Sequence, residues 1–217
     1  MIRVDTPAPG LRIAQPNRGF RYGAEAFWVA GFALEGRRPG ERTVLDVGTG
    51  SGIIAGLLAR HDFDTTGIDV QPEWLPLWAE SRRHSAVPLD LHVADVRTWV
   101  GHTYDVVVSN PPFFAATGGP ASPDPFKAAA RTELHGTLAQ LLTAAMTCVA
   151  PGGRLCLVVP IEREADVRGL GLGIRRAVQV GRRRWLAEVV RGEVSSPTVR
   201  LAETDPRVEG WAAAARA

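Results

Sequence analysis

The segment YDVVVSNPPFF, from Tyr104 to Phe114, contains the residues of this sequence best suited to hold a planar polar group. Its apolar run ends at Asn110, and Pro111 and Pro112 can continue neither a strand nor a helix. The side-chain oxygen of Asn110 and the backbone oxygen of Pro111 could accept two hydrogens of one amino group, and Phe113 offers a flat stacking face. Strands that stop abruptly often present functional groups. The alternative is a proline-rich strand end followed by core phenylalanines.

A second polar turn, DVGTGSG over residues 46–52, lies between an apolar run and a predicted helix. Its glycines permit positive φ and let a ligand approach the backbone closely. A dinucleotide-binding turn would read G-x-G-x-x-G, whereas this one reads G-x-G-x-G with Asp46 two positions before Gly48. Because that carboxylate would repel a pyrophosphate, the turn favours an ammonium or sulfonium ligand over a phosphate.

Short apolar runs alternate with helical patterns along most of the chain, which is typical of a parallel sheet covered on both faces. The runs at 43–47, 65–69, 89–93, 104–109 and 154–160 predict strands, and 52–60, 71–84 and 132–149 predict helices. The tail segments 174–181, 183–190 and 197–203 lack a long helix between them, so we expect an antiparallel edge there. The sequence therefore predicts a single Rossmann-like, doubly wound α/β domain with a seven-stranded, mostly parallel sheet. We expect the terminal AAAARA to be frayed.

Composition limits the classes of function. A chain of 217 residues with 45% apolar and 22% charged residues fits one globular domain with a true core. No apolar run is long enough for a membrane helix and no signal-peptide pattern is found, so we expect a cytoplasmic protein with both cysteines reduced. The five histidines are scattered, which predicts no metal site. Arginines crowd the C-terminal quarter, where they could hold phosphates or form a solvated face.

The turn and the strands after it resemble class I S-adenosylmethionine-dependent methyltransferases in three motifs that occur in the family's order. VLDVGTGSG resembles the first motif, GID ends the second strand, and ADV follows the third. The resemblance implies that S-adenosyl-L-methionine is the cofactor, that Asp69 binds its ribose hydroxyls, and that Asp95 with the backbone of Val96 contacts its adenine. A strand-terminal Asp taken alone could equally be a helix cap. The candidate cofactor residues of the three motifs are Asp46, Gly48, Thr49, Gly50, Gly52, Asp69, Val70, Asp95 and Val96, with Asn110 beside them.

The segment QPNRGFRYGAEAFWVAGFA before the first motif resembles the N-terminal motif of the bacterial tRNA adenine-N6 methyltransferase family. Gln15, Gly19, Arg21, Gly23, Glu25 and Ala26 match it, with Glu in place of the more usual Asp. The resemblance implies an N-terminal segment and helix over residues 1–40 that covers the cofactor, and a catalytic domain over 41–217. Tyr22 and Glu25 could close over the cofactor, or could be a core aromatic and a helix-start acid.

In these families the motif [D/N/S]-P-P-[Y/F/W] marks methylation of an amino nitrogen in adenine, guanine or a glutamine amide. The resemblance thus implies transfer to an exocyclic amino group in RNA, with adenine N6 in tRNA favoured and guanine N2 in rRNA as an alternative. Protein glutamine, a small-molecule amine and a non-catalytic cofactor-binding scaffold are the other readings. The implied catalytic residues are Asn110, Pro111, Pro112 and Phe113, and the implied substrate-binding residues are Phe113, Phe114, Arg21 and Arg131. The sequence does not fix the oligomeric state.

Overall fold

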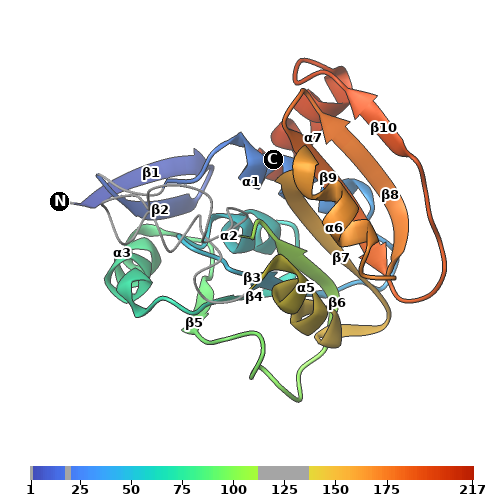
Figure 1. The fold of residues 1–217 in the computed structure, drawn as a ribbon. Helices are drawn as coiled ribbons and strands as arrows, with labels where there is room; N and C mark the ends of the chain where they lie inside the picture. Colours follow the sequence, from blue (N-terminus) through green and yellow to red (C-terminus); the bar gives the residue numbers. More distant parts are fainter. Residues whose placement is uncertain (1, 18–20, 112–136) are drawn as a thin grey trace, which may run out of the picture.

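The computed structural model describes residues 2–17, 21–111 and 137–217, and a central eight-stranded sheet dominates them (Figure 1). Its strand order is β10-β8-β9-β7-β6-β3-β4-β5. The strands are β3 (Thr43–Val47), β4 (Asp64–Asp69), β5 (Asp90–Val93), β6 (Tyr104–Ser109), β7 (Val149–Pro160), β8 (Gly173–Val180), β9 (Arg184–Val190) and β10 (Thr198–Leu201). The expected Rossmann-like α/β fold with a mostly parallel sheet is confirmed.

The strand directions determine which loops lie at each edge of the sheet. β3 to β7 run parallel, β9 is antiparallel to both β7 and β8, and β10 is parallel to β8. The sheet has eight strands rather than seven, and the reversed strand β9 lies inside it rather than at its border. We call the edge where β3 to β8 and β10 end, and where β9 begins, the carboxyl edge; the opposite one is the amino edge.

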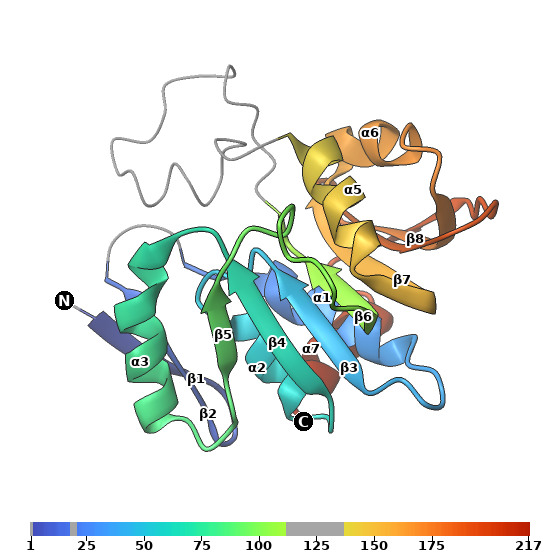
Figure 2. The ribbon, with the colours of Figure 1, turned by 90° about the horizontal axis from the view of Figure 1, so that it is seen from below.

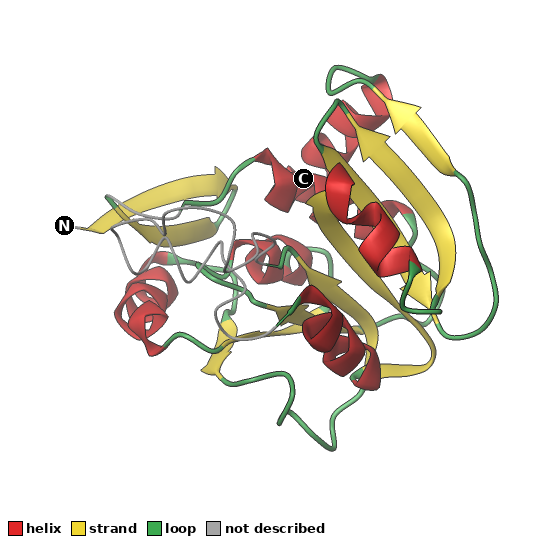
Figure 3. Cartoon of the chain, viewed as in Figure 1, coloured by secondary structure: helices red, strands yellow, loops and turns green. Residues whose placement is uncertain are grey.

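Helices cover both faces of the sheet, as expected for a doubly wound fold (Figures 1 and 3). One buried cluster joins the sheet to helices on one face, and a second joins it to α5 and α6 on the other. The first face carries α1 (Ala24–Glu35), α2 (Ile53–Ala59), η1 (Pro72–Trp74) with α3 (Leu75–His84), and α7 (Pro206–Arg216). The second carries α5 (Leu138–Thr147) and η2 (Ile161–Arg163) with α6 (Glu164–Arg168). The expected helix over 132–149 is thus α5, and residues 132–136 lie outside the described ranges.

The expectation of a frayed C-terminus is wrong, because α7 is a packed helix. Asp205 caps its start by accepting a hydrogen bond from the backbone N–H of Arg207, 2.9 Å away. Trp211 and Ala215 are buried against α1. A Cβ added to Gly31 of α1 would come within 2.2 Å of the Trp211 backbone oxygen, so Gly31 is what lets the two helices approach this closely.

The N-terminal segment folds as an antiparallel hairpin, β1 (Ile2–Ala8) and β2 (Leu11–Pro16), which the sequence reading did not predict. The hairpin forms its own two-stranded sheet beside α3, and Figure 2 shows the two side by side. The backbone N–H of Ala14 donates to the Ser81 hydroxyl oxygen at 2.8 Å, and that of Ala86 donates to the Gly10 carbonyl at 2.8 Å. These bonds fix the hairpin to the second half of α3 and to the residues just after it.

Candidate active site

The carboxyl ends of β3, β4, β5 and β6 are joined to one another by hydrogen bonds. The Ser109 hydroxyl, at the end of β6, donates to the Val47 carbonyl at the end of β3 over 2.8 Å. The backbone N–H of Gly50 donates to the Asp69 carboxylate at 2.9 Å, and that of Ala94 donates to the Asp69 carbonyl at 2.9 Å. The loops that carry the candidate residues therefore form one connected platform.

The glycine turn after β3 is the part of this platform with room for a ligand. Gly48, Gly50 and Gly52 all have positive φ, of 71°, 53° and 84°. A Cβ added to Gly48 would meet no atom of the described residues within 4 Å, whereas one added to Gly52 would lie 2.7 Å from a methyl carbon of Leu91. Gly48 therefore faces space in which a ligand could lie on the backbone, and Gly52 serves helix packing.

Asp46 lies beneath the turn and is fully buried. Its Oδ2 accepts hydrogen bonds from the Thr49 hydroxyl at 2.6 Å and from the backbone N–H of Ala55 at 3.1 Å. Its Oδ1 is buried with no hydrogen-bond partner among the described residues. Burial raises the pKa of Asp46 to about 7, with a further rise from the nearby Asp69 charge, against the lowering effect of its two hydrogen bonds. A bound cation would favour its ionised form.

Asp69 ends β4 and is oriented by backbone donors. The N–H of Gly50 donates to Oδ2 at 2.9 Å and that of Gln71 donates to Oδ1 at 3.0 Å. Asp69 is only 7% exposed, and Val70 beside it is half-buried. The carboxylate is thus held in a fixed orientation by two neutral groups at the position where the resemblance places a ribose.

Asp95, after β5, has a cation beside it that the sequence reading did not consider. The Arg97 Nε donates to both Asp95 oxygens, at 2.9 and 3.0 Å, and the Arg97 backbone N–H donates to Oδ1 at 2.9 Å. Val96 between them is buried. The predicted contact between Asp95 and an adenine amino group stays a prediction, and it requires the carboxylate to be shared with Arg97.

Among the described residues, the hydrogen-bond partners of Tyr22 lie in the N-terminal hairpin, and the partner of Glu25 lies in β9. The Tyr22 hydroxyl donates to Asp5 at 3.4 Å, and its backbone N–H donates to the Gln15 side-chain oxygen at 3.0 Å. Burial, together with the Asp5 charge, raises the pKa of Tyr22 to about 12. Glu25 pairs with Arg184 of β9 at 2.7 Å. Among the described residues neither hydrogen-bonds to the turn, so closure over a cofactor stays a prediction.

The polar stop after β6 is described through Pro111. Asn110 is half-buried, Pro111 is buried, and both follow directly on the Ser109 bond to the glycine turn. The predicted residues Pro112, Phe113, Phe114 and Arg131 lie outside the described residues. Arg21 is exposed and precedes α1.

Two tryptophans that the sequence reading passed over support the glycine turn. The Trp78 Nε1–H donates to the Gly50 carbonyl at 2.7 Å, and the Trp74 ring would lie 3.5 Å from a Cβ at Gly50. Both side chains are fully buried. The signal was present in the sequence, because tryptophans four positions apart share one helix face and this pair follows the second strand directly.

The part of the chain that the structure describes has neither a metal-binding cluster nor a helix suited to a membrane. There, no group of three or more His, Cys, Asp or Glu side chains is arranged to hold a metal ion. None of its helices combines the length and apolar character needed to cross a bilayer.

Comparison with known families places the chain. The methyltransferase small domain family matches residues 33–170, which include the glycine turn, all three acidic positions and the Asn110 stop. The chain belongs to this family. This membership agrees with the geometry above, because the matched region contains the four linked strand ends.

The names of similar curated proteins are more specific than the description of this family. The tRNA1(Val) (adenine(37)-N6)-methyltransferase of Citrobacter koseri is 33% identical over 129 residues, which are 56% of this chain and 52% of that one. The enzyme of the same name from Tolumonas auensis is 29% identical over 172 residues, covering 77% of this chain and 70% of that one. The chain thus spans about half the length of some curated relatives that it matches.

Solved methyltransferases share the fold. The ribosomal protein L11 methylase of Lactobacillus delbrueckii subsp. bulgaricus has a TM-score of 0.55 at 18% identity, covering 76% of this chain and 78% of that one. A glycopeptide N-methyltransferase complexed with S-adenosyl-L-methionine has a TM-score of 0.56 at 12% identity, covering 82% of this chain and 99% of that one. At these identities the likeness concerns architecture alone.

Proposed function

We propose that this chain is an S-adenosyl-L-methionine-dependent N-methyltransferase acting on an exocyclic amino group in RNA, with N6 of a tRNA adenine as the target. One observation carries the proposal: the Ser109–Val47 hydrogen bond joins the Asn110 stop to the acidic glycine turn. The residue proposed to accept the amino hydrogens and the turn proposed to bind the cationic cofactor are thus close in the fold. The names of the relatives support tRNA as the substrate.

Two features of the turn fit this cofactor. Gly48 leaves open space above the backbone, and the buried Oδ1 of Asp46 has no partner among the described residues. The cofactor has an ammonium and a sulfonium group, both of which suit a nearby carboxylate. It would supply the methyl group as a sulfonium substituent, and transfer leaves a neutral thioether. Asp69 and Asp95 are the candidate partners of its ribose and adenine.

The Asn110 stop would position the amino nitrogen. An exocyclic amine is a poor nucleophile because its lone pair is delocalised into the ring. The Asn110 side-chain oxygen and the Pro111 carbonyl would accept its two hydrogens, which orients the lone pair toward the methyl carbon and stabilises the positive charge that develops on nitrogen. After the nitrogen–carbon bond forms, one amino proton passes to water, so no base with a special pKa is required.

The test measures binding and transfer separately. Wild type and Asn110→Ala are titrated with S-adenosyl-L-methionine by calorimetry, then given a labelled methyl donor with tRNA, rRNA and protein fractions. We expect equal cofactor affinity and a loss of transfer of roughly 100-fold or more in the variant. Digestion of the labelled tRNA should yield N6-methyladenosine. Label in guanosine, in protein or in neither would overturn the assignment, and unchanged turnover of the variant would refute the role of Asn110.

A further inference from the structure

The seven arginines between residues 175 and 200 fall into two groups. Four have partners: Arg175 and Arg176 bind Glu188 at 3.2 and 2.8 Å, Arg184 binds Glu25, and Arg191 donates to the Met146 carbonyl at 2.8 Å. The other three, Arg182, Arg183 and Arg200, are exposed, and their side chains make no hydrogen bond or ion pair with any residue in the described ranges. We call these three the arginine edge.

The arginine edge lies at the same side of the sheet as the candidate active site. Arg182 and Arg183 form the turn between β8 and β9, and Arg200 is in register with Gln179 near the end of β8. All three are therefore at the carboxyl edge. At a strand spacing of about 4.8 Å, the turn is displaced sideways by about 10–14 Å from the end of β6, which carries Asn110, and the register places it about three residues, roughly 10 Å, further along the strand direction.

Backbone bonds hold this turn on both sides. The Gly181 N–H donates to the Leu201 carbonyl of β10 at 2.8 Å, and the Ile161 N–H after β7 donates to the Arg183 carbonyl at 3.0 Å. Ion pairing of Arg184 with Glu25 also brings the start of α1, and with it Arg21, to this edge. The guanidinium groups thus extend from a fixed turn rather than from a loose loop, which lowers the entropy lost when they bind a ligand.

Acidic neighbours do not neutralise the arginine edge. Glu203 lies beside Gly181, where an added Cβ would be 2.7 Å from its Oε1, and Glu162 is exposed just after β7. Neither carboxylate comes within ion-pair distance of Arg182, Arg183 or Arg200. The guanidinium groups remain available to an external anion, and their planar forks match phosphate geometry.

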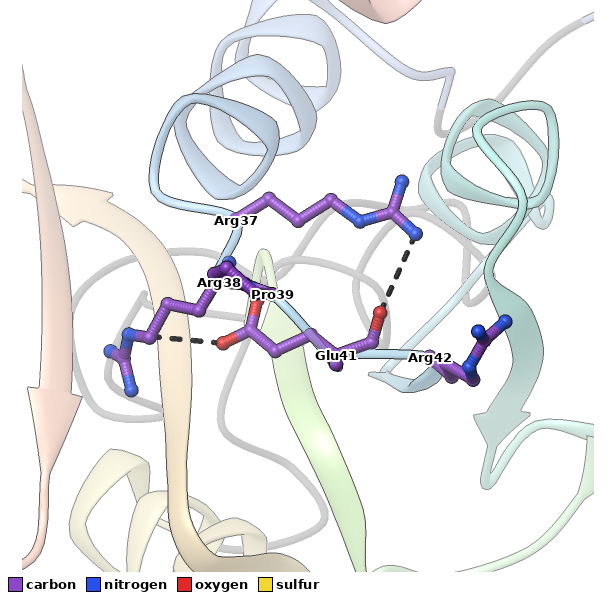
Figure 4. Close-up of a pocket in the computed structure, with 6 residues that line it drawn as sticks. Arg37, Arg38, Pro39, Glu41 and Arg42 are labelled. Carbon is purple, nitrogen blue, oxygen red and sulfur yellow. Dashed lines mark hydrogen bonds and ion pairs between the residues drawn. The ribbon is translucent and has the colours of Figure 1, made fainter.

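At the amino edge, by contrast, two of three clustered arginines bind other groups of the protein. A cavity of about 340 Å³ there is lined by Arg37, Arg38 and Arg42 with Glu41, Pro39 and Gly40 (Figure 4). Arg37 donates to the His61 carbonyl at 2.6 Å, and Arg38 binds Glu188 at 2.6 Å. Only Arg42 lacks a side-chain partner among the described residues, so this cavity is no anion site, and Arg42 provides a control.

We propose that the arginine edge binds the phosphate backbone of the RNA next to the nucleotide held at Asn110. This inference rests on the proposed function, since it takes RNA as the ligand. A run of phosphates fits three unpaired guanidinium groups fixed beside an amine-acceptor site. An anionic membrane surface or an acidic protein would require only charge and no proximity to Asn110.

The experiment measures binding of labelled tRNA to the full chain between 50 and 200 mM salt, for wild type, Arg182→Gln/Arg183→Gln and Arg200→Gln. The matched control is Arg42→Gln/Arg83→Gln, which removes the same charge from two exposed positions toward the amino edge. We expect the slope of log K against log salt to fall by about 0.7–0.9 per arginine of the edge. For Arg182→Gln/Arg183→Gln the affinity should fall roughly tenfold. Cofactor affinity and melting temperature should not change.

Equal tRNA affinities for the Arg182→Gln/Arg183→Gln variant and the control double variant would overturn the inference. So would a loss of binding to phosphatidylserine vesicles or to a polyglutamate peptide with tRNA binding intact. The binding assay needs no methyl transfer, so the two proposals fail separately. If wild type methylates tRNA but the arginine-edge substitutions do not weaken tRNA binding, only the docking surface is rejected. Wild type that binds RNA through this edge but methylates none rejects only the proposed function.

Discussion

The two edges of the sheet use the same charged residue types in opposite ways. At the amino edge, Arg154 is fully buried and its guanidinium binds both Glu41 oxygens, at 2.8 and 2.7 Å, with Glu188 3.7 Å away. Each buried charge there has an opposite charge beside it. At the carboxyl edge, Asp46 and Asp69 are held chiefly by neutral hydroxyl and backbone N–H donors.

This difference separates a structural role from a binding role. A fully compensated ion cluster has no charge left for a ligand, so we assign the Arg154 cluster to holding the sheet and α1 together. Asp46, by contrast, has only neutral donors among its described hydrogen-bond partners, and burial raises its pKa to about 7, so a cation that binds nearby would favour its ionised form. Arg97 beside Asp95 is the exception at the carboxyl edge.

The largest expected effect tests the amino edge. Arg154→Leu leaves the buried Glu41 without its main partner, whereas Glu188 keeps its three other arginine partners, and we expect the free energy of unfolding to fall by about 3–5 kcal/mol. Denaturant titration measures the loss. The same substitution at exposed Arg42 is the control and should have little effect. A loss below about 1 kcal/mol for Arg154→Leu, the range of exposed ion pairs, would contradict a structural role for the cluster.

A smaller effect is expected from matched glycines at the two edges. Gly48 and Gly40 both have positive φ, 71° and 90°, and within the described ranges a Cβ at either would meet no atom within 4 Å. Gly48→Ala and Gly40→Ala should therefore cost similar backbone strain, on the order of 1 kcal/mol. Only Gly48→Ala should weaken S-adenosyl-L-methionine binding, by roughly tenfold, because its methyl group occupies the ligand's space. Calorimetry of both variants checks this, and equal cofactor affinities would remove Gly48 from the site.

Much of this architecture could be read from the sequence. β3 and β6 occupy the predicted ranges 43–47 and 104–109, because continuous β-branched runs bounded by Gly, Asp or Pro leave little choice of structure. The hairpin and α7 were missed for the same physical reason. Prolines and glycines interrupt IRVDTPAPGLRIAQP, and the alanine-rich end has no apolar stripe of its own, so each element depends on tertiary packing. The close packing of α7 depends on Gly31 of α1, which is distant from α7 in the sequence.

The candidate site was predictable in its residue types and order, but not in its partners. Asp46, Asp69 and Asp95 follow three successive strands and could be identified by their position alone. That Arg97 pairs with Asp95, and that Arg184 reaches Glu25 across 159 positions of the chain, depends on side-chain directions that no local pattern encodes. The same holds for which arginines of the tail are paired and which are exposed.

A pH-dependent effect is expected from two aspartates whose pKa values move in opposite directions. Burial raises the pKa of Asp46 to about 7, and the groups that face it are Thr49, the Ala55 N–H and Asp69. Asp105, at the amino end of β6, is also partly desolvated, but hydrogen bonds from the Arg42 and Thr43 N–H groups and the Thr43 hydroxyl lower its pKa below the ordinary value. One carboxyl group therefore stabilises the fold when protonated, and the other when ionised.

The raised pKa of Asp46 means that the folded chain holds a proton that the unfolded chain has already released between pH 4 and 7. Its contribution to stability is complete below the unfolded pKa and is lost as the pH rises to about 7, with a slope of at most about 1.4 kcal/mol per pH unit. Asp46→Asn keeps an oxygen for Thr49 and should flatten this fall. In wild type, ionised Asp105 stabilises the fold, and this stabilisation is lost as the pH drops below 4. Asp105→Asn should remove this contribution. Denaturant titrations from pH 3 to 8 check both signs. A parallel pH profile for wild type and Asp46→Asn would show that the carboxylate under the glycine turn is already compensated. The contrast between the two edges would then not hold.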